Sequence, residues 1–330
     1  MKRATPYVLL LGLTCAGCGD DEPAMPDTSK TVPAVPERYQ RKGLDHWVGL
    51  PTDAPADDKV AQAFALASLE KDPIRAAPIL LRLLNDDAVS VQVAAVIAAG
   101  RLAPPSEHLA KVLAGFLASE DEPLRRHARR ALGQFGEHAV TPLGAALADE
   151  ALRVRWGALS ALASIGAPAE RLADAVAERA RESDDATERR QARLTLARLG
   201  PAGAEACAAF IASGDTALRD EAAAAMAHSG SAGVLPLLRL VTADDEVTAA
   251  VAAGVIQEIA LRGAMGETTP AAVAGLVKAL DREGPVRFNA MDALMAIGEP
   301  ARAPVQARMK SADPELQQML KLVLEGIGKP

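Results

Sequence analysis

The residues of this chain that could bind a metal ion or act as nucleophiles are five histidines and three cysteines in a sequence of 330 residues. Glu107-His108 returns thirty residues later as Glu137-His138, a repetition that could suit a metal site. Both pairs begin expected helices, where an acidic residue stabilises the helix N-terminus. We therefore interpret these glutamates as helix caps and expect no metal. The sequence contains no Gly-rich phosphate loop, nucleophile elbow or His-Glu-x-x-His helix.

Arginines recur along the chain at regular intervals, and clustered arginines are the side chains that bind phosphate. The recurring row is Arg125, Arg155, Arg189, Arg219 and Arg287, with Gln92, Thr248 and Gln317 at the equivalent places. Around the first of them, Arg126, Arg129 and Arg130 form a basic cluster, but residues 120–122 beside it are all acidic. We interpret the row as a structural ladder. A phosphate-binding ladder is the alternative.

We call these eight recurring residues the markers. Each marker belongs to a longer repeating unit. The intervals from Gln92 to Gln317 are 33, 30, 34, 30, 29, 39 and 30 residues. Apolar or small residues usually lie at −1, +3, +7 and +10 from each marker, which places them on one helical face. A period near 30 is typical of helical hairpins stacked into a solenoid. The sequence predicts an all-α solenoid of about eight hairpins plus a closing helix, with an enlarged loop at 260–269.

Helix ends are marked in the same rhythm. Glycine is expected to close each first helix at Gly136, Gly166, Gly200, Gly230 and Gly298. Aspartates precede the following first helices as expected N-caps, at Asp86, Asp87, Asp121, Asp149, Asp185, Asp215, Asp245 and Asp313. Each unit is thus expected to contain two helices.

The repeated pattern resembles HEAT-like repeats of the phycobilisome-lyase type, best seen in GPVRFNAMDALMAIGEPARAPV at 284–305. The resemblance covers roughly residues 58–328. It implies that each marker arginine pairs with the aspartate between repeats, as at Asp121 and Arg125. Such repeats serve as scaffolds, adaptors and a few enzymes. A metal-dependent oxidoreductase or a tetrapyrrole lyase therefore stays open as the alternative, although a lyase pocket is usually lined with aromatic side chains, which are only 3% of this chain.

The amino-terminal residues have the order of a secretory signal. Two basic residues precede the apolar run 7–13, which is too short to cross a membrane. CAGC at 15–18 resembles the bacterial lipobox, and this resemblance implies cleavage before Cys18 and acylation of that cysteine, with Cys15 standing where leucine is usual. A redox or metal pair of Cys15 and Cys18 is the alternative. We expect Cys207, in an Ala-rich helix, to be buried and inert.

A Pro-rich linker is expected to follow, so that residues 1–17 are the signal, 18–57 the linker and 58–330 the solenoid. The linker is too polar and too rich in proline to form a packed core. Trp47 and Val48 are its apolar exception. We predict that they dock on the first repeat as a cap, and the alternative is a partner-binding motif.

Composition narrows the function. The net charge is −7, which disfavours DNA, RNA and anionic lipid as ligands. We expect no cofactor and no catalytic residues. The sequence indicates a lipid-anchored scaffold in the bacterial cell envelope. The outer membrane is favoured because the residue directly after Cys18 is Gly19 and not an aspartate. A protein or peptide is expected to bind on a concave face formed by the second helices.

Overall fold

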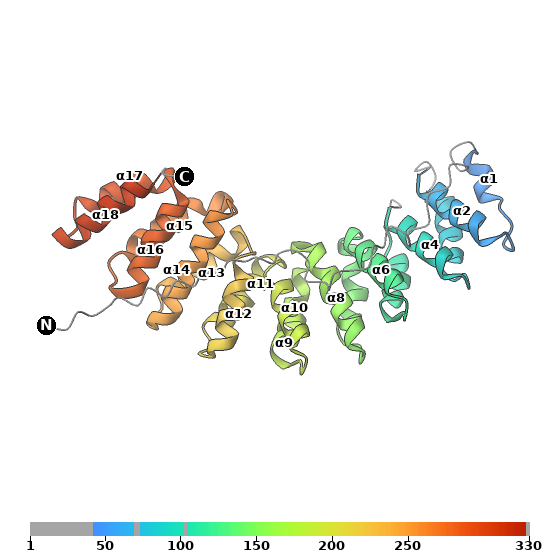
Figure 1. Ribbon diagram of the computed structural model, residues 1–330, viewed down its shortest axis with the longest axis horizontal. Helices are drawn as coiled ribbons and strands as arrows, with labels where there is room; N and C mark the ends of the chain where they lie inside the picture. Colours follow the sequence, from blue (N-terminus) through green and yellow to red (C-terminus); the bar gives the residue numbers. More distant parts are fainter. Residues whose placement is uncertain (1–41, 69–72, 102–104, 328–330) are drawn as a thin grey trace.

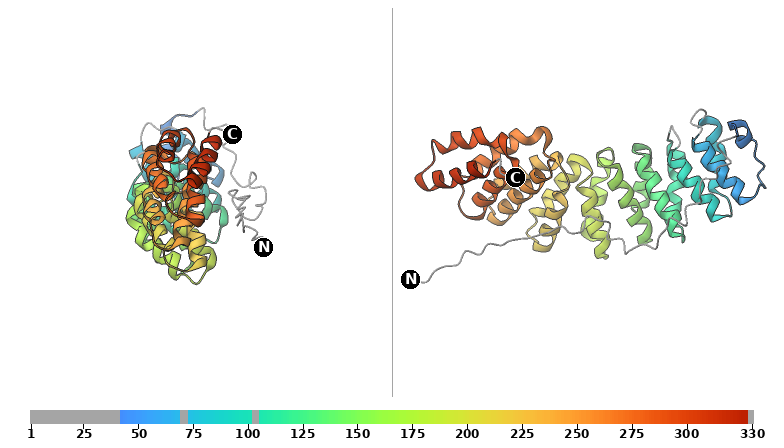
Figure 2. Two further views of the ribbon diagram at one scale, coloured as in Figure 1. Left: turned by 90° about the vertical axis from the view of Figure 1, so that its left-hand side faces the viewer. Right: turned by 45° about the horizontal axis from the view of Figure 1, so that its top comes forward.

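The computed structural model describes residues 42–68, 73–101 and 105–327, and their secondary structure is entirely helical. Helical hairpins follow one another in a single elongated, bowed stack (Figure 1). Seen along its length, the stack is narrow, with the repeats one behind another (Figure 2). The all-α solenoid predicted from the sequence is confirmed.

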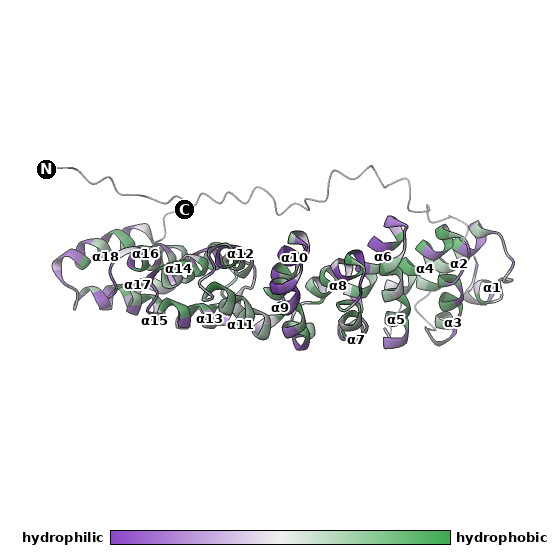
Figure 3. Cartoon of the chain, turned by 90° about the horizontal axis from the view of Figure 1, so that it is seen from below, coloured by the Kyte–Doolittle hydropathy of each residue, from purple (hydrophilic) through white to green (hydrophobic). Residues whose placement is uncertain are grey.

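Two layers of helices run the length of the stack, as Figure 3 shows: the first helices of the hairpins on one side and the second helices on the other. The first-helix layer comprises α2 (Ala56–Ser68), α4 (Val89–Arg101), α6 (Glu122–Gln134), α8 (Leu152–Ile165), α10 (Ala186–Leu196), α12 (Thr216–Met226), α14 (Glu246–Leu261), α16 (Gly284–Ile297) and the closing helix α18 (Pro314–Gly326). The second-helix layer comprises α3 (Pro73–Leu84), α5 (Glu107–Gly115), α7 (Glu137–Ala146), α9 (Ala173–Glu182), α11 (Gly200–Ile211), α13 (Ser231–Val241), α15 (Thr269–Ala279) and α17 (Glu299–Met309). A short helix, α1 (Leu44–Val48), precedes the first hairpin.

Among the described residues, three 3-10 turns lie in the connections: η3 (Phe116–Ala118), η4 (Ala167–Leu172) and η5 (Gly266–Thr268). The turn η4 follows Gly166 and delays the second helix of its hairpin to Ala173. The turn η5 occupies the enlarged loop between α14 and α15.

A continuous apolar core joins the hairpins. It extends from Val60 on α2 to Ile327 beyond α18, and small side chains form much of it. The alanines three residues after the markers, such as Ala128 and Ala158, are completely buried. Alanine at these positions allows neighbouring helices to approach closely, and each one lies on the face that the repeat pattern assigned to the core.

Glycine ends two of the first helices as predicted, and predicted aspartate caps begin five helices of this layer. Gly166 has φ +72° and ψ −140°, a conformation open essentially only to glycine, and it ends α8. Gly298 ends α16 in the same conformation. Gly136, Gly200 and Gly230 also have positive φ, but they stand at the start of the second helices α7, α11 and α13 and do not end the first helices, so the prediction was wrong for these three. The N-caps of the first helices accept a hydrogen bond from a backbone N–H three residues later at Asp121, Asp185, Asp215, Asp245 and Asp313.

Two aspartates act differently from the expected caps. Asp86 and Asp149 lie two residues before the N-cap positions of α4 and α8, and their carboxylates accept from the backbone N–H two residues later. The N-cap of α8 is Ala151, whose side chain cannot accept a hydrogen bond. Asp149 therefore orders the loop before α8 as an Asx turn.

The marker in α14 was assigned one residue too early. Val247, which then falls in the apolar row, is half exposed, whereas Thr248 and Ala249 are buried. The N-cap Asp245 lies four residues before Ala249, the same spacing as between Asp121 and Arg125. Ala249 is therefore the true equivalent of the marker arginines, because the cap fixes the rotation of the helix.

Candidate functional site

The marker side chains close the connections between hairpins. Arg125, Arg155 and Arg189 each donate from Nη1 to the backbone carbonyl six residues earlier, over 2.6, 2.9 and 2.6 Å. Gln92 makes the same contact with the carbonyl of Asp86 at 2.8 Å. These carbonyls follow the ends of second helices, where intrahelical donors are missing. The row therefore satisfies loop carbonyls, as a structural ladder would.

Two markers depart from this geometry. Arg287 donates from Nε to the carbonyls of Arg282 and Leu280, at 2.6 and 3.0 Å. Arg219 instead contacts the neighbouring Asp220, with Nε 3.1 Å from the carboxylate. The loop before each marker thus decides which acceptor its guanidinium reaches.

The resemblance implied that the aspartate four residues before a marker pairs with the marker arginine, but this aspartate instead caps the helix. The carboxylate of Asp121 accepts from the N–H of Leu124 at 2.8 Å, while the guanidinium of Arg125 extends to the loop and to Glu122. Attraction between a marker and an aspartate acts across repeats. Thr248 hydrogen bonds hold the pKa of Asp245 below its ordinary value, and Arg219 of the preceding repeat lowers it further.

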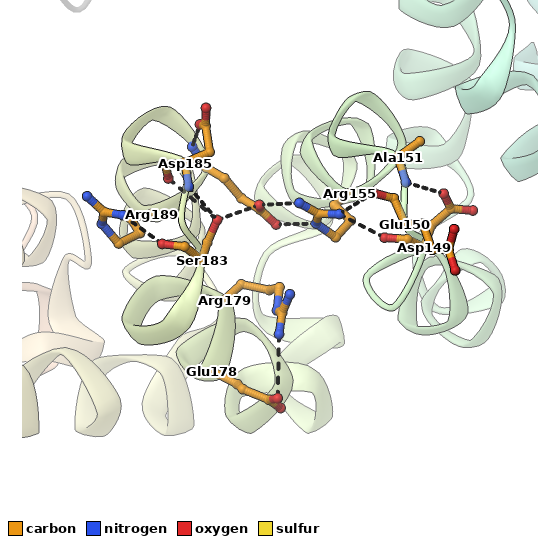
Figure 4. A network of polar contacts seen from close by, with 10 residues as sticks. Asp149, Glu150, Ala151, Arg155, Glu178, Arg179, Ser183, Asp185 and Arg189 are labelled. Carbon is orange, nitrogen blue, oxygen red and sulfur yellow. Dashed lines mark hydrogen bonds and ion pairs between the residues drawn. The ribbon is translucent and has the colours of Figure 1, made fainter.

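A buried ion pair joins two repeats in the middle of the stack (Figure 4). Arg155 on α8 donates from Nε and Nη2 to the two carboxylate oxygens of Glu188 on α10, each over 2.8 Å. The Ser183 hydroxyl donates to the same carboxylate at 2.6 Å. Burial alone would raise the pKa of Glu188, but the bonds from Arg155 and Ser183 outweigh burial and lower it. Glu188 is therefore an ionised structural group, not a base.

Sequence reasoning missed Glu188, although a signal was present. It occupies the position before the marker, where the other repeats have an apolar or threonine side chain that is buried or, at Leu218, half-buried: Val91, Leu124, Val154, Leu218, Thr248, Val286 and Leu316. A charged residue in a row of core positions requires a buried partner. Arg155 of the preceding repeat is that partner.

A groove of about 650 Å³ opens on the first-helix layer, where α6, α8 and the start of α10 meet. Its lining includes Leu117, Leu152 and Trp156, together with Arg125, Arg129 and Arg153. The guanidinium carbon of Arg129 lies 4.6 Å from the centroid of the Trp156 ring, a cation–π contact between α6 and α8. Gly157 gives the groove part of its depth: a Cβ there would lie 3.0 Å from the tip of Leu117.

Ion pairs border this groove. Glu122 pairs with Arg125 and lies 3.6 Å from Arg129. Arg153 reaches Glu120 at 2.7 Å, and both side chains are largely exposed. The acidic residues beside the basic cluster of α6 therefore neutralise part of it, as the sequence indicated.

A second groove, of about 460 Å³, lies on the second-helix layer between α5 and α7. Alanines, Gly115 and Pro142 form most of its lining, and its charged residues are Glu107, Lys111 and Asp149. It has no aromatic side chain among its described lining residues. It therefore offers a partner mainly a shallow surface of small side chains.

The other residues singled out in the sequence have simpler surroundings. Cys207 is fully buried in α11, and burial raises the pKa of its thiol to about 12, so the nucleophilic thiolate is suppressed. Cys15 and Cys18 lie outside the described residues. In the described ranges, no group of three His, Cys, Asp or Glu side chains could hold a metal ion. The same ranges contain no helix of the length and apolarity needed to span a bilayer.

Trp47 packs against the first hairpin. Its side chain on α1 is 2% exposed and forms a small cluster with Ala61 and Ala65 of α2. Gln62 donates from Nε2 to the Trp47 carbonyl over 2.5 Å, and Arg75 of α3 pairs with Asp45 of α1 at 2.8 Å. Residues 44–48 thus cover the end of the stack from within the segment assigned to the linker.

Comparison with known proteins agrees with the architecture. A family model of HEAT repeats matches residues 109–197, from α5 through α10. No curated protein matches the sequence. Similar solved chains include one from a homology model of the full-length AP-3 complex in an intermediate open conformation, with 14% identity, TM-score 0.45, and coverage of 83% of this chain and 55% of that one. A chain of the Kap95:Nup1 complex has 14% identity, TM-score 0.42, and coverage of 89% and 52%. This chain spans about half the length of both.

Proposed function

We propose that this protein is a non-catalytic scaffold or adaptor that binds a protein or peptide and is held in the bacterial cell envelope by a lipid anchor at Cys18. The observation that carries the proposal is the continuous core from α2 to α18. Such a stack orders a long double layer of helices whose outer faces stay available for contact. A binding partner would therefore meet a preformed surface with little ordering cost.

The anchor rests on the sequence alone. The CAGC motif at 15–18 supports acylation of Cys18, and more than one acyl chain makes membrane attachment stable. Residues 18–41 could extend at most roughly 80 Å at about 3.3 Å per residue. Tethering within that reach raises the local concentration of the solenoid near a partner in the same membrane. Gly19 after the cysteine favours the outer membrane.

The pattern at 284–305 further supports assigning the repeats to the phycobilisome-lyase type of HEAT-like repeat. We carry over only the architecture. The ladder and the buried pair of Arg155 and Glu188 serve the stack itself, which supports the scaffold over an enzyme built on the same repeats.

The proposal is tested in two steps. Mass spectrometry of the mature protein should find Cys18 acylated, and an unmodified thiol there would contradict the anchor. Crosslinked partners are then purified from detergent-solubilised envelope with the tagged full chain and with tagged residues 1–57. A defined protein recovered in near-stoichiometric amount with the full chain only is the expected result. Equal recovery with both would count against a binding role for the solenoid.

A further inference from the structure

We propose that the groove between α6, α8 and α10 binds an extended acidic peptide segment of a partner protein, with an apolar side chain of that segment seated beside Trp156. This inference rests on the proposed scaffold function and names the surface and the chemistry of the partner. It places the partner on the first-helix layer, whereas the sequence alone suggested the second helices.

The groove has the side chains that anchor an apolar residue. Leu152 is 40% exposed at the first position of α8, one turn before Trp156. Trp156 is half-buried, and Arg129 covers part of its ring. An aromatic ring fixed by a neighbouring guanidinium is a rigid contact surface, and tryptophan and arginine are the side chains that most often supply binding energy at protein interfaces.

Charge around the groove selects for carboxylates. Three arginines and two acidic residues line it. One acid, Glu122, is engaged by Arg125 and Arg129, and the other, Asp185, accepts the N–H of Glu188 as an N-cap. Arg153 has an exposed and easily exchanged partner in Glu120.

The same geometry disfavours a continuous polyanion. Glu122 and Asp185 stand among the arginines, so a phosphate backbone or an anionic membrane would meet repulsion at both carboxylates. A peptide can place its acidic residues opposite the arginines and an apolar residue opposite Leu152 and Trp156. The groove between α5 and α7 lacks this combination, since its charges are two acids and one lysine.

The experiment selects from a random twelve-residue peptide library on the full chain in detergent micelles. Two variants serve as comparison. Leu152→Asp places a carboxylate at the groove, and Val89→Asp is its matched control, because Val89 is the first residue of α4 and is 44% exposed. Circular dichroism and melting verify that both variants fold. The best selected peptide is then titrated by Trp156 emission, with Trp156→Phe identifying the signal.

Selected peptides should combine Asp or Glu with an apolar residue. Leu152→Asp should bind them about tenfold more weakly or worse, through lost apolar contact and added repulsion, while Val89→Asp binds within about twofold of the natural chain. No enrichment, basic peptides, or equal binding by both variants would overturn the groove assignment. Phosphatidylglycerol vesicles that displace the peptide from the natural chain but not from Leu152→Asp would overturn it in favour of a membrane surface. Equal binding by both variants leaves the scaffold proposal intact, since the envelope capture tests that proposal separately.

Discussion

Arg155 and Glu188 lie thirty-three residues apart in sequence and form a two-bonded ion pair between α8 and α10, with both donor–acceptor distances 2.8 Å. The Glu188 side chain is completely buried, and that of Arg155 is 17% exposed. A buried carboxylate tolerates this position only because the guanidinium and the Ser183 hydroxyl compensate for lost hydration. The pair fixes the spacing of two repeats in the middle of the stack.

Arg155→Met should destabilise the protein by about 3–5 kcal/mol at neutral pH, because it leaves Glu188 buried without its counter-ion. The difference in free energy of unfolding between the natural chain and Arg155→Met should decrease as the pH is lowered. In the natural chain Glu188 has a lowered pKa, so its stabilising contribution is complete above the ordinary glutamate pKa and is lost as pH falls through the lower folded value. In the variant, burial raises that pKa, so protonation relieves the penalty.

Urea denaturation of both proteins at pH about 7 and about 4.5 measures how much the difference in their free energies of unfolding decreases. Arg239→Met is the matched control, since Arg239 pairs with Glu205 on exposed surface and should contribute less than about 1 kcal/mol. A difference between natural chain and Arg155→Met that stays constant across pH would show that Glu188 does not carry the effect.

Trp47→Ala should loosen the amino-terminal end of the stack. Removing a buried tryptophan costs about 3–5 kcal/mol, here chiefly by exposing Ala61 and Ala65 on α2. Hydrogen exchange should accelerate in α1 and α2 and stay unchanged in α8. Asp53→Ala, at an exposed side chain between α1 and α2, should leave α2 protected. Unchanged exchange in Trp47→Ala would mean that α1 does not act as a cap.

Asp215→Ala should fray the start of α12. The Asp215 carboxylate accepts the Leu218 N–H at 3.0 Å, and loss of such an N-cap costs about 0.5–2 kcal/mol. Asp215→Asn retains an acceptor and should behave as the natural chain does. Amide exchange of the first turn of α12 separates the variants, and equal protection in all three proteins would contradict the assigned cap.

Cys207 should resist alkylation in the folded protein. Its thiol is buried in α11 with a pKa of about 12, so almost no thiolate is present near neutral pH. Iodoacetamide followed by peptide mass spectrometry should label Cys207 only after addition of denaturant. Rapid labelling of the native chain would show that α11 opens or that the thiol is activated.

The architecture was predictable because the same sequence features recur in each repeat. Leucine or valine before the marker, alanine three residues later and glycine at the helix end each reinforce one helical period, so the fold follows from local rules. The marker in α14 is displaced by one residue in the prediction from sequence, because this helix has no arginine at the marker position to fix the register of the repeat. The cap at Asp245 corrects it, and that cap was visible in the sequence.

The candidate site was less predictable because it depends on contacts between repeats. Glu188 broke the apolar row visibly, yet only the stacking of α8 on α10 identifies Arg155 as its partner. Trp156 is one of two tryptophans in the chain. Its contact with Arg129, and the groove they share with Leu117, depend on the offset between α6 and α8, which residue spacing within one repeat does not determine.

Small-angle X-ray scattering of the purified full chain tests most directly whether the eight hairpins form one extended solenoid. A compact 330-residue protein has a radius of gyration of about 20 Å. First helices spaced about 8–10 Å apart from α2 to α18 give a stack on the order of 80 Å long. We expect a radius of gyration above the compact value, a distance distribution with a long tail, and a cross-section two helices thick. A value near 20 Å with a symmetric distance distribution would contradict it.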